Sequence, residues 1–228
     1  MSGDLIDTTE MYLKAVYELI EEGVRPLRAR LVERLEQSKP TVSETVARLE
    51  RDGLLYVDSS RTICFTDEGR VRATAIMRKH RLTEVLLLNV IGIEWYLIHN
   101  EACKWEHVMS DYVEEKVSAL VKQVSYDPFG NPIPYDDRGL GNDVAAASGL
   151  RSLEELLKEN AEGGLYVLER IGEPLQVDDV LLKEFFEAGI QPTQKILVSV
   201  DGDDLTISVD GSSTIDVTPW MQKHLYVR

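Results

Sequence analysis

The chain has few cysteines and no long hydrophobic run, and each shortage excludes a class of protein. Two cysteines among 228 residues, Cys64 and Cys103, cannot form the disulfide framework of a small secreted domain. No stretch reaches the roughly 18 consecutive apolar residues of a membrane-spanning helix. The first ten residues, MSGDLIDTTE, also lack the basic and apolar regions of a secretory signal. We therefore expect a soluble, cytoplasmic protein with no membrane partner.

Positive charge is scarce as well, but it is unevenly distributed. The net charge of −15 by itself argues against nucleic-acid binding, because a phosphate backbone attracts clustered Lys and Arg. Between Arg25 and Lys79, however, 12 Lys and Arg accompany 8 Asp and Glu, whereas the segment after Lys79 has 12 against 26. A mildly basic module followed by an acidic one is compatible with an N-terminal nucleic-acid-binding module, and also with ordinary solvated helices.

The first third of the chain predicts three helices followed by a hairpin. Asp7 and Glu10 have the spacing of a reciprocal helix cap, in which each side chain bonds to the other's backbone. Ser38 and Pro40 are typical of the N-cap and first turn of a later helix. The expected elements are helices over residues 8–22, 27–37 and 38–53 and strands over 54–57 and 62–65. Three helices and a hairpin form a winged helix-turn-helix.

The remaining chain predicts further helices and then a small β-barrel. Thr66 with Gly69 begins a long helix that is interrupted at Gly92, and an amphipathic helix over 111–124 could supply a dimer face. Alternating apolar residues then predict strands on both sides of the turn at 201–203, together with a helix over 180–188. The fold class is thus mainly α with a small β-barrel.

Three of the four histidines lie within 28 residues, beside other potential metal ligands. His80 and Glu84 are four residues apart on one helix face. The other candidates form a stripe with helical spacing and one neighbour, namely His99, Cys103 and His107 with Glu106. The alternative is that Cys103 is a small core residue and the histidines are satisfied by hydrogen bonds. A set of thiolate, imidazole and carboxylate suits iron, cobalt, nickel or zinc better than magnesium or calcium.

Two functions would use such a cluster. A metalloenzyme would need an open coordination position, whereas a metal-responsive regulator would pair the cluster with a DNA-binding module. The adjacent helix-turn-helix favours the regulator, and no separate acid–base or nucleophile constellation is evident in the sequence. We therefore expect no enzymatic activity.

Several spaced motifs resemble one family over nearly the whole chain. They are DTTEMYL, RLEQSKPTVSETVARLERDGL, MRKHRLTE, HNEACKWEHVMSD and DPFGNPIP. The chain is similar to the diphtheria-toxin-repressor family of iron-dependent transcriptional regulators. The resemblance implies a metal-activated repressor, most simply responding to iron(II), of genes for iron uptake and homeostasis, with a manganese sensor of the same family as the alternative. It implies a winged helix-turn-helix DNA-binding domain over 1–73, a helical dimerisation and metal-binding domain over 74–125, a Pro- and Gly-containing linker over 126–149, and an SH3-like barrel over 150–228.

The resemblance also implies two metal sites per chain. The primary site would use Met11, Cys103, Glu106 and His107. The ancillary site would use His80, Glu84, His99, Glu173 and Gln176, the last two by alignment of the short string EPLQV. Met11 taken alone would be core filler. Iron(II) is the expected ion, and cobalt, nickel, manganese or zinc could replace it in vitro.

The implied partners are double-stranded DNA with a palindromic operator and a second copy of the chain, with one or two dimers on each operator. The candidate DNA-contacting residues are Arg28, Ser38, Lys39, Pro40, Thr41, Ser43, Glu44 and Arg48. Glu44 departs from the family, which has glutamine there, and we expect it to pair with Arg48 or to accept from a cytosine amino group. The prolines at 128, 132 and 134 resemble the proline-rich segment that the family's SH3-like domain can hold, or form a stiff spacer.

Overall fold

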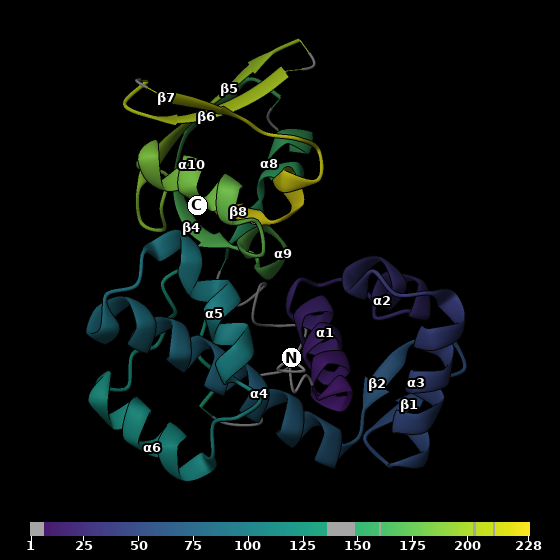
Figure 1. Cartoon of the computed structure of the whole chain (residues 1–228). Helices are drawn as coiled ribbons and strands as arrows, with labels where there is room; N and C mark the ends of the chain where they lie inside the picture. Colours follow the sequence, from purple (N-terminus) through teal and green to yellow (C-terminus); the bar gives the residue numbers. More distant parts are fainter. Residues whose placement is uncertain (1–6, 136–148, 160, 203, 212) are drawn as a thin grey trace.

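The computed structural model describes residues 7–135, 149–159, 161–202, 204–211 and 213–228, arranged in three lobes (Figure 1). The first lobe contains α1 (Thr8–Glu21), α2 (Arg28–Leu35), α3 (Lys39–Arg51), β1 (Leu55–Val57) and β2 (Ile63–Phe65). The second is built from α4 (Asp67–Leu86), the π-helical turn η1 (Leu87–Ile91), the 3₁₀ turn η2 (Trp95–Leu97), α5 (Ile98–Trp105) and α6 (Asp111–Leu120). In Figure 1 the long helix α4 runs from the first lobe into the second, and a C-terminal sheet lies above both.

Local capping places the helices of the first lobe close to their predicted bounds. The Asp7 side chain accepts a hydrogen bond from the backbone N–H of Thr9, and Ser38 accepts one from Thr41 with Pro40 in the first turn. Asp7 does cap α1, but the reciprocal pair predicted for it was wrong: Asp7 accepts from Thr9 and not from Glu10, and the Glu10 carboxylate lies 2.6 Å from Nδ1 of His107. Glu10 therefore contacts a residue that is distant in the sequence and does not help to cap α1.

The predicted winged helix-turn-helix is confirmed. Strands β1 and β2 pair antiparallel, and the side chains of Ile63 and Phe65 on β2 are buried in the core of the first lobe. Gly69 in the first turn of α4 lies so close to the hairpin that a Cβ there would be 1.8 Å from the carbonyl oxygen of Leu54. This close approach fixes the start of α4 against the wing.

In the second lobe, the predicted long helix changes from an α-helix to a π-helical turn near its C-terminal end. Helix α4 continues into η1, which ends at Gly92 in the left-handed conformation. Helix α6 ends at Leu120, four residues earlier than predicted. No helix within the described ranges has both the length and the apolar character needed to cross a membrane.

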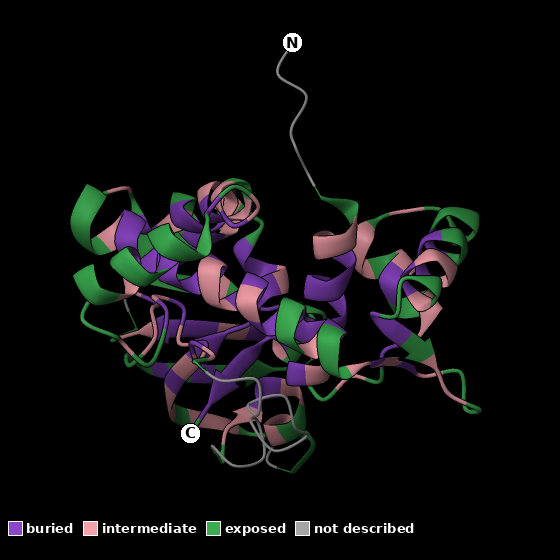
Figure 2. Cartoon of the chain, turned by 90° about the horizontal axis from the view of Figure 1, so that it is seen from below, coloured by how far each residue is buried: buried purple, intermediate pink, exposed green. Residues whose placement is uncertain are grey.

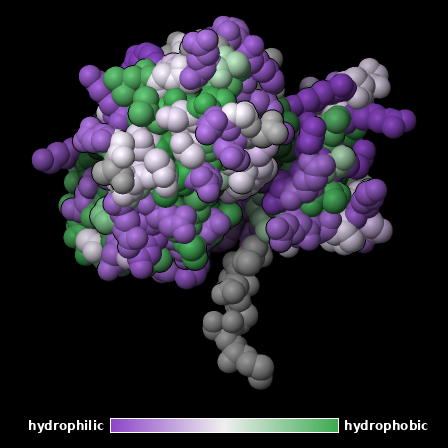
Figure 3. Space-filling view, turned by 90° about the horizontal axis from the view of Figure 1, so that it is seen from above, coloured by the Kyte–Doolittle hydropathy of each residue, from purple (hydrophilic) through white to green (hydrophobic). Residues whose placement is uncertain are grey.

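The C-terminal lobe is a six-stranded antiparallel sheet with strand order β3-β8-β4-β5-β6-β7. Its strands are β3 (Arg151–Ser152), β4 (Gly163–Ile171), β5 (Lys195–Asp201), β6 (Asp204–Val209), β7 (Ser213–Asp216) and β8 (Leu225–Val227), joined by α8 (Leu153–Glu159), α9 (Glu173–Gln176), α10 (Asp179–Glu187) and the 3₁₀ turn η4 (Met221–Lys223). Figure 2 shows the buried residues along these strands and the long helices. On the face seen in Figure 3, hydrophobic side chains lie in patches among hydrophilic ones.

The segment between the helical lobes and the sheet packs against β4 around Phe129 and Gly130 and returns to the second lobe at Ile133. Phe129 is fully buried in the sheet's core, and its carbonyl accepts a hydrogen bond from Ile171 N at 2.8 Å. Gly130 has a φ of +84°, and a Cβ there would lie 2.0 Å from the carbonyl oxygen of Glu169. Only glycine satisfies both conditions without distortion. The rest of the predicted linker, up to residue 148, lies outside the described residues.

Candidate metal centre

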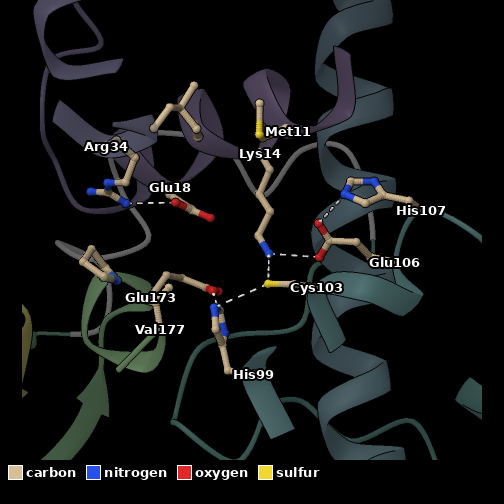
Figure 4. A pocket seen from close by; sticks show the side chains of 13 residues that line it. Met11, Lys14, Glu18, Arg34, His99, Cys103, Glu106, His107, Glu173 and Val177 are labelled. Atoms are coloured by element: carbon tan, nitrogen blue, oxygen red, sulfur yellow. Dashed lines mark hydrogen bonds and ion pairs between the residues drawn. The ribbon is translucent and has the colours of Figure 1, made fainter. Parts of the chain in front are cut away.

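The predicted ligands gather where α1, α4, α5 and α9 meet. Helix α4 supplies His80 and Glu84, and α5 supplies His99 and Cys103. Because α5 ends at Trp105, the predicted helical stripe stops before His107, which follows Glu106 in the next turn. The short helix α9 brings Glu173 and Gln176 from the C-terminal lobe. Figure 4 shows the side chains that α1, α5 with the turn after it, and α9 direct toward one space, among them Met11, Cys103 and Glu173.

The ancillary set forms a compact, fully buried network. Nε2 of His80 lies 2.9 Å from Oε1 of Glu84, as the spacing of four residues predicts, and 3.2 Å from Nδ1 of His99. His99 Nδ1 in turn lies 3.1 Å from the same Glu84 oxygen. Oε2 of Glu173 lies 3.5 and 3.6 Å from these two histidine nitrogens. Gln176, three residues after Glu173 on α9, is buried and donates to the carbonyl of Ile171 at 2.7 Å.

The primary set touches the ancillary set directly. Cys103 Sγ lies 3.5 Å from Nε2 of His99, and His80 Nδ1 lies 2.6 Å from Oε2 of Glu106. His80, His99 and Cys103 offer donor atoms that all lie within 4.8 Å of one another. His107 points instead to Glu10, with Nε2 still 3.3 Å from Oε1 of Glu106. The structure thus presents one continuous cluster where the resemblance implies two separate sites.

Lys14, on α1, is a member of this cluster that sequence reasoning missed. Its side-chain nitrogen donates to Glu106 Oε2 at 2.9 Å and to Cys103 Sγ at 3.5 Å, and lies 3.0 Å from Nδ1 of His80. The residue is 8% exposed. A lysine among apolar residues of an amphipathic helix carries no sequence signal for such a position, because long cationic side chains usually reach solvent.

The charges of the cluster stabilise one another. Burial alone would raise the pKa of the Cys103 thiol, but His99 and Lys14 outweigh it and hold that pKa well below its usual value. Burial likewise opposes ionisation of Glu106, yet Lys14 and His80 lower its pKa to about 2. For His99, the thiolate of Cys103 overcomes burial and raises the pKa to about 10. The cluster therefore holds anionic donors interleaved with cationic side chains.

A second buried cation, Arg81, ties the cluster to all three lobes. Its guanidinium donates to both oxygens of Glu21 on α1, at 2.8 and 2.7 Å, and to Oε1 of Glu173 on α9 at 3.1 Å. It also donates to the carbonyl of Pro132 at 2.6 Å and lies 3.6 Å from the Asp127 carboxylate. Glu173 is thereby shared between Arg81 and the histidine pair.

A cavity of about 280 Å³ opens beside the cluster, between α1, α5 and α9. Met11, Lys14 and Glu18 line it from α1, while Cys103, Glu106 and His107 line the opposite wall. Met11 is partly buried and faces the cavity that its proposed partner ligands share (Figure 4). The four residues of the primary set thus border one space.

The donor set suits a transition-metal ion. Imidazole, thiolate and carboxylate together match the preferences of iron, cobalt, nickel or zinc. Within the described residues, Glu84 Oε2, Glu173 Oε2 and Gln176 Oε1 are buried and accept no hydrogen bond. Buried oxygen lone pairs without a donor are costly, and a bound cation would satisfy them. The ancillary residues therefore fit a metal on their own geometry.

Most of the candidate DNA-binding residues lie at the N-cap and in the first two turns of α3. Ser38, Lys39, Pro40, Thr41, Ser43 and Glu44 are exposed, whereas Arg28 and Arg48 are partly buried. The expected pair of Glu44 with Arg48 was wrong, because Arg48 donates to Thr9 at 3.2 Å and lies 3.8 Å from Asp52. Glu44 is therefore presented at the surface without that partner.

Comparison with known proteins gives a consistent result. A model of the N-terminal DNA-binding domain of iron-dependent repressors matches residues 4–63, and a model of their metal-binding and dimerisation domain matches residues 66–135. The chain is 49% identical over 210 residues to the diphtheria toxin repressor of Corynebacterium diphtheriae, covering 91% of each chain. It is 49% identical over 198 residues to the iron-dependent repressor IdeR of Mycobacterium leprae, covering 86% of this chain and 85% of that relative. A solved manganese-dependent transcriptional repressor in complex with manganese superposes with a TM-score of 0.77 at 26% identity, over 96% of this chain and 99% of that one.

Proposed function

Because the chain belongs to the family of iron-dependent repressors, we propose that it is an iron(II)-activated transcriptional repressor of genes for iron uptake and homeostasis. The observation that carries this proposal is the buried cluster of imidazole, thiolate and carboxylate groups that joins α4 and α5 to α1 and α9. It lies beside a winged helix-turn-helix that exposes the N-terminal half of α3. A metal-responsive regulator needs its metal site in contact with its DNA-binding domain, whereas a metalloenzyme would not need a DNA-binding domain.

We assign the ligands to two overlapping groups. Met11, Cys103, Glu106 and His107 would form the primary site around the cavity, and His80, Glu84, His99, Glu173 and Gln176 the ancillary site. A divalent cation at each site would supply the positive charge that balances its carboxylate and thiolate donors. Since Met11 lies on the DNA-binding lobe and Cys103 on the second lobe, their joint use would restrict how the two lobes move relative to each other. Such a preference for one arrangement is what couples an effector to DNA binding.

The proposed partners follow from the same family. The chain would bind double-stranded DNA as a homodimer, and a two-fold dimer would read a palindromic operator, by one dimer or by two. A repressor acts where the chromosome is, so we propose the cytoplasm as its location. The candidate contacts are Arg28, Ser38, Lys39, Pro40, Thr41, Ser43, Glu44 and Arg48.

Manganese is the second candidate effector, because solved structures of manganese-dependent repressors share this fold at 26% and 27% identity. The thiolate of Cys103 favours iron, since a softer ligand suits manganese less well. Cobalt, nickel and zinc should bind in vitro, as the affinity order among divalent ions predicts.

The test is a DNase footprint on genomic fragments with and without iron(II), manganese(II), cobalt(II), nickel(II) and zinc(II). We expect protection that depends on metal, with iron(II) effective at lower free concentration than manganese(II). Protection that is identical with and without every metal would refute the sensor.

Replacement of one ligand tests the site itself. Cys103→Ala should abolish metal-stimulated protection, because removing a direct donor should cost more than the roughly 10–100-fold in metal affinity that loss of an outer-shell partner costs. Cys64→Ala is the matched control, because Cys64 lies on β2 outside the cluster. Metal affinity measured by calorimetry should fall in the first variant and stay unchanged in the second.

A further inference from the structure

Within the described residues, Lys14 is the lysine whose ammonium contacts proposed ligands of both metal sites. Its Nζ lies 2.9 Å from Glu106, 3.0 Å from His80 and 3.5 Å from Cys103. The three contacted groups belong to both ligand sets. A metal ion bound by the thiolate and imidazole groups would lie ~2.0–2.3 Å from their donor atoms. The same lone pairs of these donor atoms cannot accept hydrogen bonds from an ammonium and coordinate a dication at the same time.

The ammonium of Lys14 is a buried counter-ion to Glu106 and Cys103, and not a charge on the surface. Lys14 is 8% exposed and Glu106 is 3% exposed, so their ion pair is screened little by solvent. If the ammonium were removed and nothing replaced it, the two neighbouring buried anions Cys103 and Glu106 would be balanced by the histidines alone. Weaker compensation of buried charges is unfavourable in a protein interior.

The cavity beside α1 leaves room for the Lys14 side chain to adopt a second position. The cavity of about 280 Å³ borders Lys14 and is lined by Glu18, one helical turn farther along α1. Arg34 contacts Glu18 through Oε2 only, at 2.9 Å. The second carboxylate oxygen can therefore accept from a lysine that swings along the helix.

We propose that Lys14 is a built-in competitor for the metal site: its ammonium neutralises Cys103 and Glu106 until a divalent cation takes its place, and its departure into the cavity accompanies metal binding. This inference rests on the proposed function and adds a residue that sets the metal threshold. Because Lys14 lies on the same helix as Met11, the exchange replaces one link between α1 and α5 with another. Both states thus keep the two lobes in contact, with different bonds.

The first test measures metal affinity in the full-length chain. Cobalt(II) is titrated into the chelator-treated protein while the thiolate-to-cobalt charge-transfer absorption is followed. Lys14→Leu, which removes the competitor without adding a ligand, should bind cobalt about tenfold more tightly, the scale on which groups beside metal ligands change affinity. Lys14→Arg should stay close to the wild type because it keeps the cation.

Lys158→Leu is the matched control, since Lys158 pairs with Glu154 on the exposed surface of α8, at 3.0 Å. It removes the same charge and should leave the cobalt affinity unchanged. Equal or weaker affinity in Lys14→Leu would overturn the proposal, because it would make Lys14 a structural counter-ion or a supporter of the site.

The second test uses the unmodified protein and so does not depend on a variant folding. An amine-acylating reagent is applied with and without saturating cobalt(II), and the labelling of Lys14 is measured by mass spectrometry. We expect slow labelling without cobalt and faster labelling with it, because the ammonium leaves its three partners. If cobalt binds but the labelling of Lys14 does not change, the proposed exchange is refuted and the proposed sensor is not. If cobalt does not bind the unmodified protein at all, the proposed sensor is refuted.

Discussion

At the scale of single residues, Glu44 shows how a contact expected from helical spacing can be replaced. Glu44 and Arg48 are four residues apart on α3, but the guanidinium of Arg48 turns to Thr9 on α1. The carboxylate of Glu44 therefore stays on the exposed face that would meet DNA. Phosphates repel an ionised glutamate, and glutamate cannot donate to a base edge as glutamine does.

We predict that Glu44→Gln strengthens binding to the family's usual palindromic operator several-fold at low salt. The reason is the removal of one negative charge beside the phosphates, so the gain should shrink as salt screens the charges. Fluorescence anisotropy at two salt concentrations measures both effects. Glu187→Gln, on the exposed end of α10, is the control and should change neither. Unchanged or weaker binding of the α3 variant would contradict this role.

The site residues separate into those that spacing can find and those that it cannot. His80 and Glu84 were predictable because four residues on one helix bring two side chains together. The stripe through His107 was wrong because α5 ends at Trp105. Lys14, Glu10 and Arg81 were missed, since their burial is decided by elements distant in the sequence.

At the scale of elements, caps and turns were predictable and distant pairings were not. Thr66 caps α4 by accepting from the N–H of Gly69, as the local sequence indicates. Strands β5 and β6 followed from their alternation and short turn. Strand β4 was missed, because it pairs with β5 and with the distant β8 and its burial pattern alternates poorly. Pairing between distant segments leaves little trace in local sequence.

The contact between the turn before β8 and the C-terminal cap of α1 should make folding stability depend on pH. His224, just before β8, is buried with Nδ1 3.8 Å from Glu22, the residue that caps α1. Burial, with Arg34 and Lys223 nearby, lowers its pKa from 6.5 to about 4. The unfolded chain then binds this proton more readily than the folded chain. The stabilisation is complete above pH 6.5 and is lost as the pH falls toward 4, by at most about 3 kcal/mol.

We predict that His224→Phe loses less stability than the wild type between pH 6.5 and 4. Urea unfolding of both proteins without metal, at a series of pH values, measures the difference. The comparison is needed because Glu18, with a pKa raised by burial to about 7, acts in the opposite direction in both proteins. Parallel stability profiles would show that His224 is not the responsible group.

At the scale of the whole molecule, Arg81 and Glu173 connect the three lobes through one buried network. Arg81 lies on α4, its partner Glu21 on α1, and Glu173 on α9. Glu173 also faces His80 and His99. We therefore expect a change in the proposed metal cluster to reach the C-terminal lobe through Glu173 and the first lobe through Arg81 and Glu21. Removing one partner of such a buried charge network is expected to cost about 3–5 kcal/mol.

The surface of the second lobe carries exposed apolar side chains suited to a second copy of the chain. Val108 and Tyr112 are each 69% exposed, and Val113 and Leu120 on α6 are 45% and 58% exposed. Val113 and Leu120 are seven residues apart and share one helix face. The family's dimerisation domain matches this part of the chain. We therefore predict that α6 and the turn before it form the dimer contact.

We predict that the double variant Val113→Glu and Leu120→Glu sediments as a monomer at concentrations where the wild type is dimeric. Each buried apolar side chain contributes about 1.5–3 kcal/mol, and a two-fold interface uses each position twice. Metal binding per chain should survive, because neither residue lies in the cluster, while affinity for a palindromic operator should fall steeply. Val180→Glu, 69% exposed on α10, is the control and should remain dimeric. A double variant that still sediments as a dimer would place the interface on another face, and one that loses metal binding as well would link the dimer contact directly to the cluster.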